Sequence, residues 1–258
     1  MATPRALILR APGTNCDEET AFAFERAGAQ ASSLHINALR EQPSLASDAQ
    51  ILCIPGGFSF GDDLGAGRIF AAQIRHHLTG LLQTYIDQGR LVLGICNGFQ
   101  VLLQSGVFNS DDGSEHQPAT LTLNDSGQFE DRWVQLCVTS EKSVFLVGIE
   151  HMYLPVAHAE GKFVGRDEKV MNDWESRGQL AVRYAADCQS EVVPYPGNPN
   201  GSQRNVAGCC DESGRAFGLM PHPERFIDRT HHPRWTREKL PEAGDGLRIF
   251  ANAVAFFG

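Results

Sequence analysis

The stretch that decides the fold is residues 91–104, which read LVLGICNGFQVLLQ. Its first five residues form a continuous apolar run, which is typical of a strand buried on both faces of a parallel sheet. The amphipathic run at 98–104, followed by Gly106, predicts a helix and its end. A strand that turns sharply into a helix through Gly94-Ile95-Cys96-Asn97-Gly98 has the form of a nucleophile elbow, with Cys in place of Ser.

The first hundred residues repeat this alternation of strand and helix. Strands are predicted at residues 6–10, 33–36 and 50–54, and helices at residues 18–27, 67–78 and 81–87. Strands and helices that alternate at this spacing form parallel sheets covered on both faces. The sequence therefore predicts an α/β fold with an open, mostly parallel sheet flanked by helices.

The middle of the chain has a different pattern. Strand-like runs lie at 121–123, 133–139, 144–147, 153–157 and 179–184, with few helices between them. This favours an antiparallel β extension. After a turn at Asn198-Pro199-Asn200-Gly201, strands at 206–210 and 216–220 and a helix at 246–257 complete the fold. Because no long linker interrupts the chain, residues 1–258 are expected to form a single domain.

Charge, termini and cysteines limit the classes of function. The formal net charge of -9 disfavours nucleic acid and anionic membranes, which bind clustered Lys and Arg. The apolar run at residues 6–9 is too short for a signal peptide or a membrane span. Seven cysteines without a paired framework indicate reduced thiols. We therefore expect a cytoplasmic protein that binds neither nucleic acid nor membrane.

The elbow predicts that Cys96 is a nucleophile. Its glycines allow a strained backbone and close packing, so that the thiol stands at the carboxyl edge of the sheet. The positive end of the following helix favours the thiolate. The N–H of Asn97 can bind an oxyanion there. The alternative interpretation is a small buried cysteine at the end of a strand.

A second motif, MPHPER at residues 220–225, supplies a base. If the segment is extended, side chains two residues apart face the same way, so Glu224 lies beside His222. Pro223 discourages helix there. The carboxylate would fix the imidazole tautomer while His222 accepts the thiol proton. The alternative is a surface ion pair.

Two further residues are candidates for binding the substrate. Gly57 ends the strand at 50–54, where its N–H could be a second oxyanion donor; the alternative is a plain tight turn. Gln100, one helical turn after Cys96, could reach a substrate amide or carboxylate, or could simply be solvated. We predict no metal site.

Together these segments resemble the triad-type glutamine amidotransferase family, and more closely the glutaminase subunits that serve purine biosynthesis. The resemblance covers essentially the whole chain and rests on PGTNCD (12–17), IPGGFSFGD (54–62), LGICNGFQ (93–100), PVAH (155–158), NGS (200–202) and MPHPER (220–225). It implies a flavodoxin-like amidotransferase fold. It also implies that Cys96 is the nucleophile, His222 the general base and acid and Glu224 its orienter, with Gly57 and Asn97 as oxyanion donors.

The resemblance also implies partners. The chain lacks a G-x-x-x-x-G-K-[ST] phosphate loop. A separate synthetase subunit is therefore expected to bind ATP and magnesium and to convert formylglycinamide ribonucleotide to formylglycinamidine ribonucleotide. This chain would hydrolyse glutamine for it, without a cofactor of its own. The sequence leaves open whether the partner is one chain or includes a small accessory subunit. Residues 58–68 and 198–202 are candidate contact segments.

Some features leave alternatives open. The regions 110–143 and 229–244 look like additions to the family pattern, and their role is open. Related cysteine-elbow proteins act as hydrolases or chaperone-like proteins, but typically lack a late His-x-Glu pair. A non-catalytic binding module is the third alternative. Cys16 is a rival nucleophile without a glycine-bounded elbow, and His158 is interpreted as a core histidine.

Overall fold

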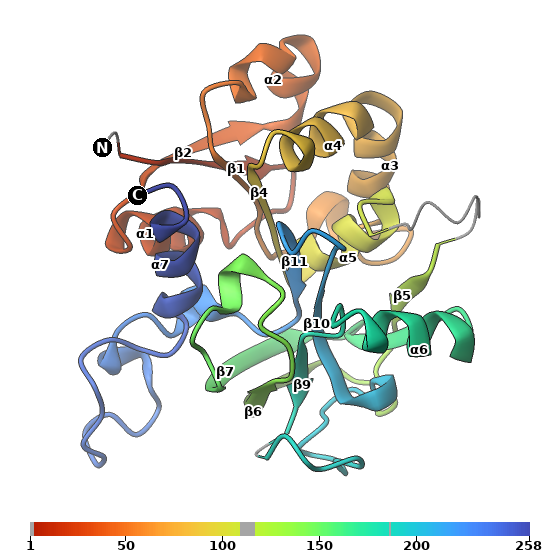
Figure 1. Cartoon of the computed structure of the whole chain (residues 1–258), viewed down its shortest axis with the longest axis vertical. Helices are drawn as coiled ribbons and strands as arrows, with labels where there is room; N and C mark the ends of the chain where they lie inside the picture. Colours follow the sequence, from red (N-terminus) through yellow and green to blue (C-terminus); the bar gives the residue numbers. More distant parts are fainter. Residues whose placement is uncertain (1–2, 109–116, 186) are drawn as a thin grey trace.

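The computed structural model describes residues 3–108, 117–185 and 187–258, and within them one large sheet forms the centre of the molecule (Figure 1). Its nine strands follow the order β2-β1-β3-β4-β11-β10-β9-β6-β7. The bounds are β1 Arg5–Arg10, β2 Gln30–His35, β3 Ile51–Ile54, β4 Leu91–Ile95, β6 Glu130–Val138, β7 His151–His158, β9 Val182–Tyr184, β10 Val206–Cys210 and β11 Ala216–Leu219. A separate antiparallel pair joins β5 (Ala119–Thr122) to β8 (Lys162–Gly165).

The first five strands in this order are mutually parallel. All residues of β3 and β4 are buried, which explains their unbroken apolar sequences. Helices cover both faces of this half (Figure 1). Their bounds are α1 Asp17–Arg26, α2 Ile36–Glu41, α3 Arg68–His77, α4 Thr79–Asp87, α5 Asn97–Ser105 and α7 Leu247–Ala255. The predicted α/β fold with a mostly parallel sheet is confirmed.

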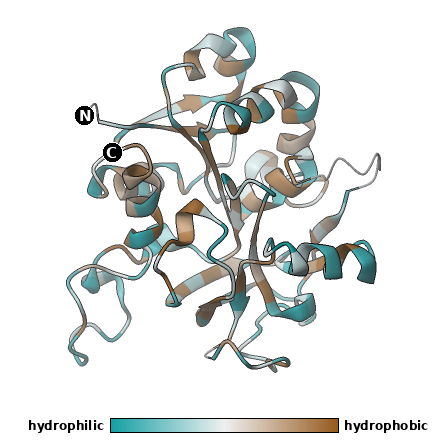
Figure 2. Cartoon of the chain, viewed as in Figure 1, coloured by the Kyte–Doolittle hydropathy of each residue, from teal (hydrophilic) through white to brown (hydrophobic). Residues whose placement is uncertain are grey.

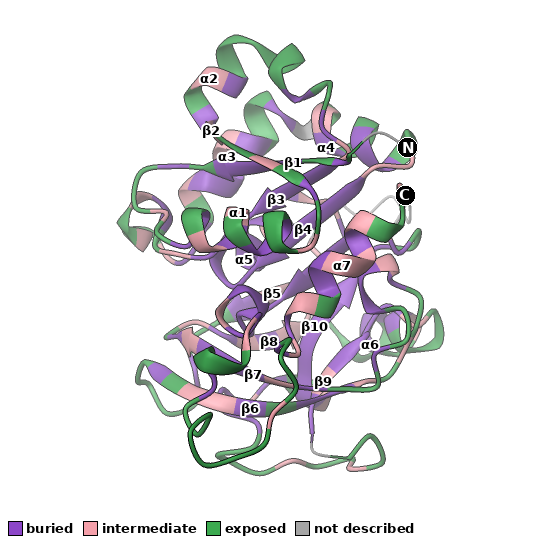
Figure 3. Cartoon of the chain, turned by 90° about the vertical axis from the view of Figure 1, so that its left-hand side faces the viewer, coloured by how far each residue is buried: buried purple, intermediate pink, exposed green. Residues whose placement is uncertain are grey.

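The hydropathy and burial patterns show why the two-sided cover is needed. The central strands are mostly apolar, whereas the outer faces of the helices are polar (Figure 2). The same strands form the buried centre of the molecule (Figure 3). On one face, α1 and α7 pack together through Phe24 and Phe250, whose ring centroids lie 4.9 Å apart, edge to face.

The other half of the sheet is antiparallel, as the middle of the sequence predicted. Two details differ from the prediction. The run 144–147 is not a strand, because Val144–Leu146 forms a short 3-10 turn that buries Phe145 and Leu146. A helix that was not predicted, α6 (Glu168–Ser176), begins at Asp167, whose carboxylate accepts a hydrogen bond from the N–H of Val170.

One pair of cysteines corrects the expectation of seven reduced thiols. Cys137 and Cys188 form a disulfide, while the other five cysteines are free and buried. The two partners are 51 residues apart in sequence. Only the pairing of β6 with its neighbours brings them together, so no local spacing could predict the bond. No helix among the described residues could span a membrane, being too short or too polar.

The two stretches that looked like additions have different structures. Residues 110–116 of the first lie outside the described residues, and the remainder supplies β5 and β6. The second, 229–244, is an excursion closed at its base by a bridge between Asp228 and Ala243. His232 anchors it, because its buried ring packs against Trp133 at a centroid distance of 5.3 Å.

Candidate active site

The turn after β4 holds Cys96 in the conformation expected of an elbow. Cys96 has φ 51° and ψ -106°, and α5 begins at the next residue. A Cβ on Gly98 would lie 1.8 Å from the carbonyl oxygen of Ile54, so that position tolerates only glycine. The turn thus presents a non-glycine residue at positive φ, which is uncommon and concentrates at functional sites.

The predicted contact between His222 and Glu224 is present, although it arises differently from the prediction. His222 Nδ1 lies 2.6 Å from Glu224 Oε1, and both side chains are buried. The segment is not extended, because Pro223–Arg225 forms a 3-10 turn with proline at its first position. Proline's fixed φ suits the first position of such a turn, so it starts the turn that it was expected to prevent.

His222 lies between charged and polarisable partners. The thiols of Cys96 and Cys16 act on this ring electrostatically, while its buried Nε2 has no hydrogen-bond partner among the described residues. Burial alone would lower the pKa of His222, but the Glu224 carboxylate raises it well above the ordinary value, with smaller contributions from the neighbouring thiols of Cys96 and Cys16. The site therefore stabilises an imidazolium, the state formed when His222 accepts a thiol proton.

Cys16, the rival nucleophile, also reaches this histidine. Its sulfur lies 3.1 Å from Nη2 of Arg225, whose Nε donates to Glu19. Burial raises the pKa of Cys16 despite the hydrogen bond with His222. Its backbone, with φ -104° and ψ 13°, is not an elbow. The sequence did not predict that Cys16 and Arg225 would lie beside the pair, although both belong to motifs that carried the resemblance.

The structure brings Cys96 to the wall of a cavity of about 200 Å³. Its lining residues are Gly57, Phe58, Asp62, Ala66, Cys96, Gln100, Ala157, His158, Ala159 and Glu160. Gly57 has φ +132°, and a Cβ there would lie 2.7 Å from the backbone nitrogen of Asn15. A side chain would therefore not fit at this position of the cavity wall, and the role of Gly57 as an oxyanion donor stays a prediction.

Asn97 and Gln100 are held by hydrogen bonds rather than solvated. The Asn97 amide donates to Asp62 and to Gln100 Oε1, and its oxygen accepts from the Ser59 hydroxyl at 2.6 Å. Gln100 Nε2 donates to the backbone oxygen of Glu160 at 2.6 Å. Both side chains thus fix the walls of the cavity. The solvated alternative for Gln100 does not hold, since this residue is buried.

Two acidic residues of the cavity were not predicted. Burial raises the pKa of Asp62, whose carboxylate accepts from the N–H of Gly67 and the Asn97 amide. Glu160 Oε2 accepts from the N–H of Ala66 at 3.3 Å. Asp62 closes the motif at 54–62 but was given no role, and Glu160 lies outside the motifs, because the two segments meet only through the fold.

His158 is buried, as expected for a core histidine, but it also lines the cavity. Its Nδ1 lies 3.2 Å from Asn124 Oδ1. Burial, together with the charge of nearby His222, lowers the pKa of His158 to about 3. This ring is therefore neutral near pH 7 and adds no charge to the site.

The candidate contact segments differ in accessibility. Residues 58–68 contribute to the cavity and include the exposed side chains of Phe58 and Leu64. In contrast, the side chains of Asn198, Asn200 and Ser202 are buried in their own hydrogen-bond network. Little of this second segment is therefore available to a partner.

Two groups of side chains in the described residues have donor atoms close enough to share a cation. The donor atoms of Cys16, His222 and Glu224 lie within 4.8 Å of one another, but the adjacent Arg225 guanidinium opposes a cation there. The second group is Cys137, His151 and Cys188, away from the cavity, where the two sulfurs are joined to each other.

Known proteins match the chain along its length. The family described as the CobB/CobQ-like glutamine amidotransferase domain matches residues 3–257. A protein of Dehalococcoides mccartyi named phosphoribosylformylglycinamidine synthase subunit PurQ is 49% identical over 257 residues, covering 98% of each chain. A PurQ of Methanococcus maripaludis is 40% identical, covering 98% of this chain and 97% of its own.

Solved structures show the same fold. The structure of PurLQS from Thermotoga maritima aligns with a TM-score of 0.75 and 28% identity, covering 100% of both chains. A glutamine amidotransferase of Thermotoga maritima aligns with a TM-score of 0.54 and 16% identity, covering 91% of this chain and 81% of its own, a likeness of fold alone. The chain therefore belongs to the CobB/CobQ-like glutamine amidotransferases and, within them, to the family of PurQ subunits.

Proposed function

We propose that this chain is the glutaminase subunit of phosphoribosylformylglycinamidine synthase. It hydrolyses glutamine to glutamate and delivers the ammonia to a synthetase subunit that converts formylglycinamide ribonucleotide to formylglycinamidine ribonucleotide in purine biosynthesis. The observation that carries the proposal is the buried His222–Glu224 pair beside Cys96, the member of the three that lines a small cavity. The names of the relatives supply the destination of the ammonia.

The reaction begins with the attack of the Cys96 thiolate on the side-chain carbonyl carbon of glutamine. His222 takes the thiol proton and gives it to the leaving ammonia, which leaves a glutamyl thioester. A water molecule then attacks the thioester, with His222 as base, and glutamate is released. Glu224 holds the Nδ1 side of the imidazole and stabilises its positive charge throughout.

The developing oxyanion needs donors near Cys96. The backbone N–H of Asn97, at the start of α5, and that of Gly57, across the cavity, are the proposed pair. The Asn97 side chain helps to position both walls, because Ser59 and Asp62 bind it from the segment that follows Gly57. Gln100 has an indirect role in substrate binding, since it fixes the backbone of Glu160.

Asp62 and Glu160 are proposed to recognise the α-ammonium group of glutamine. Both carboxylates line the cavity, and no Lys or Arg is among the lining residues. The negative charge of Glu160 contributes to raising the pKa of Asp62. A cationic group on the ligand would relieve this repulsion. A Glu160→Gln variant should therefore raise the KM for glutamine more than it lowers kcat, which steady-state assays would measure.

The synthetase partner is proposed to carry ATP and magnesium, because the sequence of this chain contains no G-x-x-x-x-G-K-[ST] loop. The name PurLQS, borne by the Thermotoga maritima structure, supports an assembly with a synthetase subunit. A small accessory subunit is proposed as a further partner. Phe58, Leu64 and Phe129 form the proposed contact surface, because all three are exposed and Phe58 stacks on Phe129 at 6.4 Å. We also propose a cytoplasmic location and a single domain over residues 1–258.

The decisive experiment compares two nitrogen sources in the reconstituted complex. Cys96→Ala should abolish turnover with glutamine while turnover with added ammonia continues. Adding the synthetase should also stimulate the glutaminase activity of the unmodified chain. A cysteine-elbow hydrolase or chaperone-like protein would show neither behaviour. Full glutamine-dependent turnover by Cys96→Ala would refute the proposal.

A further inference from the structure

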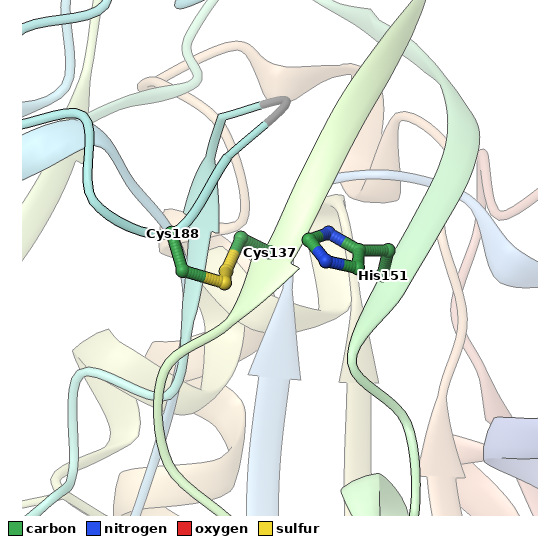
Figure 4. A group of neighbouring side chains, drawn as sticks. All are labelled: Cys137, His151 and Cys188. Atoms are coloured by element: carbon green, nitrogen blue, oxygen red, sulfur yellow. A yellow bond between two sulfur atoms is a disulfide. The ribbon is translucent and has the colours of Figure 1, made fainter.

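A second cysteine cluster comprises Cys137, His151 and Cys188 (Figure 4). It lies near the end of β6, and none of its residues lines the catalytic cavity. Cys137 stands on β6 directly opposite His151 of β7. Cys188 reaches them from the segment after β9 and forms the disulfide with Cys137. The two sulfurs and a ring nitrogen of His151 lie within 4.8 Å of one another. An imidazole thus accompanies a cysteine pair that no step of the proposed reaction uses.

Exposure separates Cys188 from the other cysteines, since its partner Cys137 is 0% exposed. Cys188 and His151 are exposed, whereas the five free cysteines are buried. Among the latter, Cys96 is 5% exposed and Cys16 is 1% exposed. Because thiol–disulfide exchange requires access of the attacking sulfur, a dissolved disulfide or thiol will meet Cys188 before any other cysteine. An exposed disulfide is also the labile kind.

The disulfide fixes a segment with few other attachments to the sheet. Residues 187–197 have no regular secondary structure, and Val192 is 83% exposed. Tyr195 is held to β6 by Arg132, whose Nη2 donates to its hydroxyl at 2.7 Å and whose guanidinium lies over its ring. Asn205 bonds the backbone of Glu191 and Val193. The covalent bond is therefore the strongest tie between this segment and β6.

We propose that Cys137 and Cys188 form a reversible exchange site for low-molecular-weight disulfides and thiols, with His151 as the proton acceptor. The thiolate of Cys188 attacks one sulfur of a disulfide RSSR, forms a mixed disulfide and releases RS⁻. The thiolate of Cys137 then attacks the sulfur of Cys188 and releases the second RS⁻. His151 relays the two cysteine protons to the leaving thiolates, so that two protein thiols and RSSR give the protein disulfide and two RSH.

The reverse reaction frees the segment. Excess thiol attacks the exposed sulfur of Cys188, and a second thiol completes the reduction. Residues 187–197 then keep only their hydrogen bonds and the Arg132–Tyr195 contact. We therefore expect local opening of this segment in the reduced state, while the sheet and the catalytic cavity keep their structure. The inference does not depend on the proposed glutaminase activity.

The test uses the full chain equilibrated in mixtures of glutathione and glutathione disulfide at different ratios. After acid quenching and alkylation, peptide mass spectrometry measures how much Cys137–Cys188 disulfide is present. We expect a complete and reversible change from dithiol to disulfide, with Cys96 and Cys16 still alkylated as free thiols after unfolding. The proposal is wrong if the pair stays fully in one state at every ratio, or if the other cysteines oxidise equally fast.

Two variants test the parts of the site separately. His151→Gln should slow formation of the disulfide at pH 7 by about tenfold, since proton transfer to a positioned histidine is lost. His76→Gln, at an exposed histidine of α3, is the matched control and should change nothing. Equal rates of disulfide formation in the two variants would show that His151 takes no part in the exchange. With Cys188→Ser, proteolysis within 187–197 should be fast at every glutathione ratio, whereas the unmodified chain should be protected only when oxidised.

Discussion

Two turns of this molecule place a cysteine beside the same histidine, but they differ in backbone conformation and in access to the cavity. Cys96 and Cys16 both interact with His222, and each stands immediately before a helix. Cys96 has a positive φ and lines the cavity. Cys16 has a negative φ and is not among the residues that line the cavity. Its sulfur accepts a hydrogen bond from the Arg225 guanidinium.

The helices that follow the two cysteines also differ. The first turn of α1, after Cys16, contains Asp17, Glu18 and Glu19. The first turn of α5, after Cys96, contains no acidic residue. Acidic side chains offset the positive end of a helix, so only α5 leaves that end free to stabilise a thiolate or an oxyanion. Proximity to His222 therefore does not by itself make a cysteine the nucleophile. Cys96 differs from Cys16 because its thiol lines the cavity at the uncompensated positive end of a helix.

The largest expected effect comes from removing the presented thiol. Cys96→Ala should lower glutamine hydrolysis by about 10⁴-fold or more, since loss of a nucleophile removes the covalent route. The free energy of unfolding should change little by comparison, because the small alanine fits the turn's volume although not its positive φ. Glutamate release and urea unfolding measure the two effects. A loss of glutamine hydrolysis below tenfold would show that Cys96 is not the nucleophile and that the two turns do not differ in this respect.

The second prediction concerns the positive charge on His222, the histidine that lies near both thiols. His158, near that charge, has a pKa lowered from 6.5 to about 3, so the folded chain resists protonation at His158. The stability tied to this residue is present above pH 6.5 and is lost as the pH falls toward 3. The difference amounts to roughly 4 to 5 kcal/mol at most.

Urea unfolding between pH 7 and pH 4 measures this dependence. In a His158→Gln variant, the slope of unfolding free energy with pH should be smaller, whatever the variant's absolute stability. Identical slopes in the two proteins would show that His158 is not the neutral buried neighbour of a charged His222.

The third prediction tests the backbone of the elbow. Gly98→Ala should destabilise the fold by about 3 kcal/mol or more, because its Cβ would overlap the carbonyl of Ile54. Gly80→Ala is the matched control: this glycine is exposed in α4 and an added Cβ meets nothing within 4 Å. The control should be neutral or gain up to about 1 kcal/mol. Equal midpoints of thermal unfolding for both variants would contradict the packing described for Gly98.

The smallest effect is expected at the second thiol. Cys16→Ala should lower kcat/KM by up to about tenfold, equivalent to about 1.4 kcal/mol, because His222 loses one interaction but keeps Glu224 and Cys96. The pH profile of kcat/KM should shift at the same time, which a purely structural role would not cause. A loss as large as that of Cys96→Ala, with the fold intact, would make the two turns equivalent.

The parallel half of the fold could be predicted because its signals are local. Most of its strands are short apolar runs, and most of its helices end near a glycine. The exceptions are β2, which is largely polar, and α2, which has no glycine near its end and was not predicted. The antiparallel half was predicted less well. The run Val144–Val147 has the composition of a strand, but its central residues are buried in a 3-10 turn. Helix α6 was missed although Asp167 supplies a capping signal, because polar residues dominate its exposed face.

The candidate site shows the same division. The Cys96 elbow and the His222–Glu224 contact followed from residues adjacent in sequence, even though the second forms through a 3-10 turn. Asp62 and Glu160 could not be predicted, because they come from segments almost a hundred residues apart. The Cys137–Cys188 bond is equally non-local. Contacts between segments far apart in sequence could not be predicted from local patterns, because the folded core determines which segments meet.

The central claim, that Cys96 rather than Cys16 is the nucleophile, is tested most directly by locating the covalent intermediate. The chain is incubated with a glutamine-mimicking diazo-ketone, digested, and its peptides are analysed by mass spectrometry. We expect one adduct, on the peptide that contains Cys96, with Cys16 unmodified even after long incubation. An adduct on Cys16 with Cys96 unmodified would contradict it.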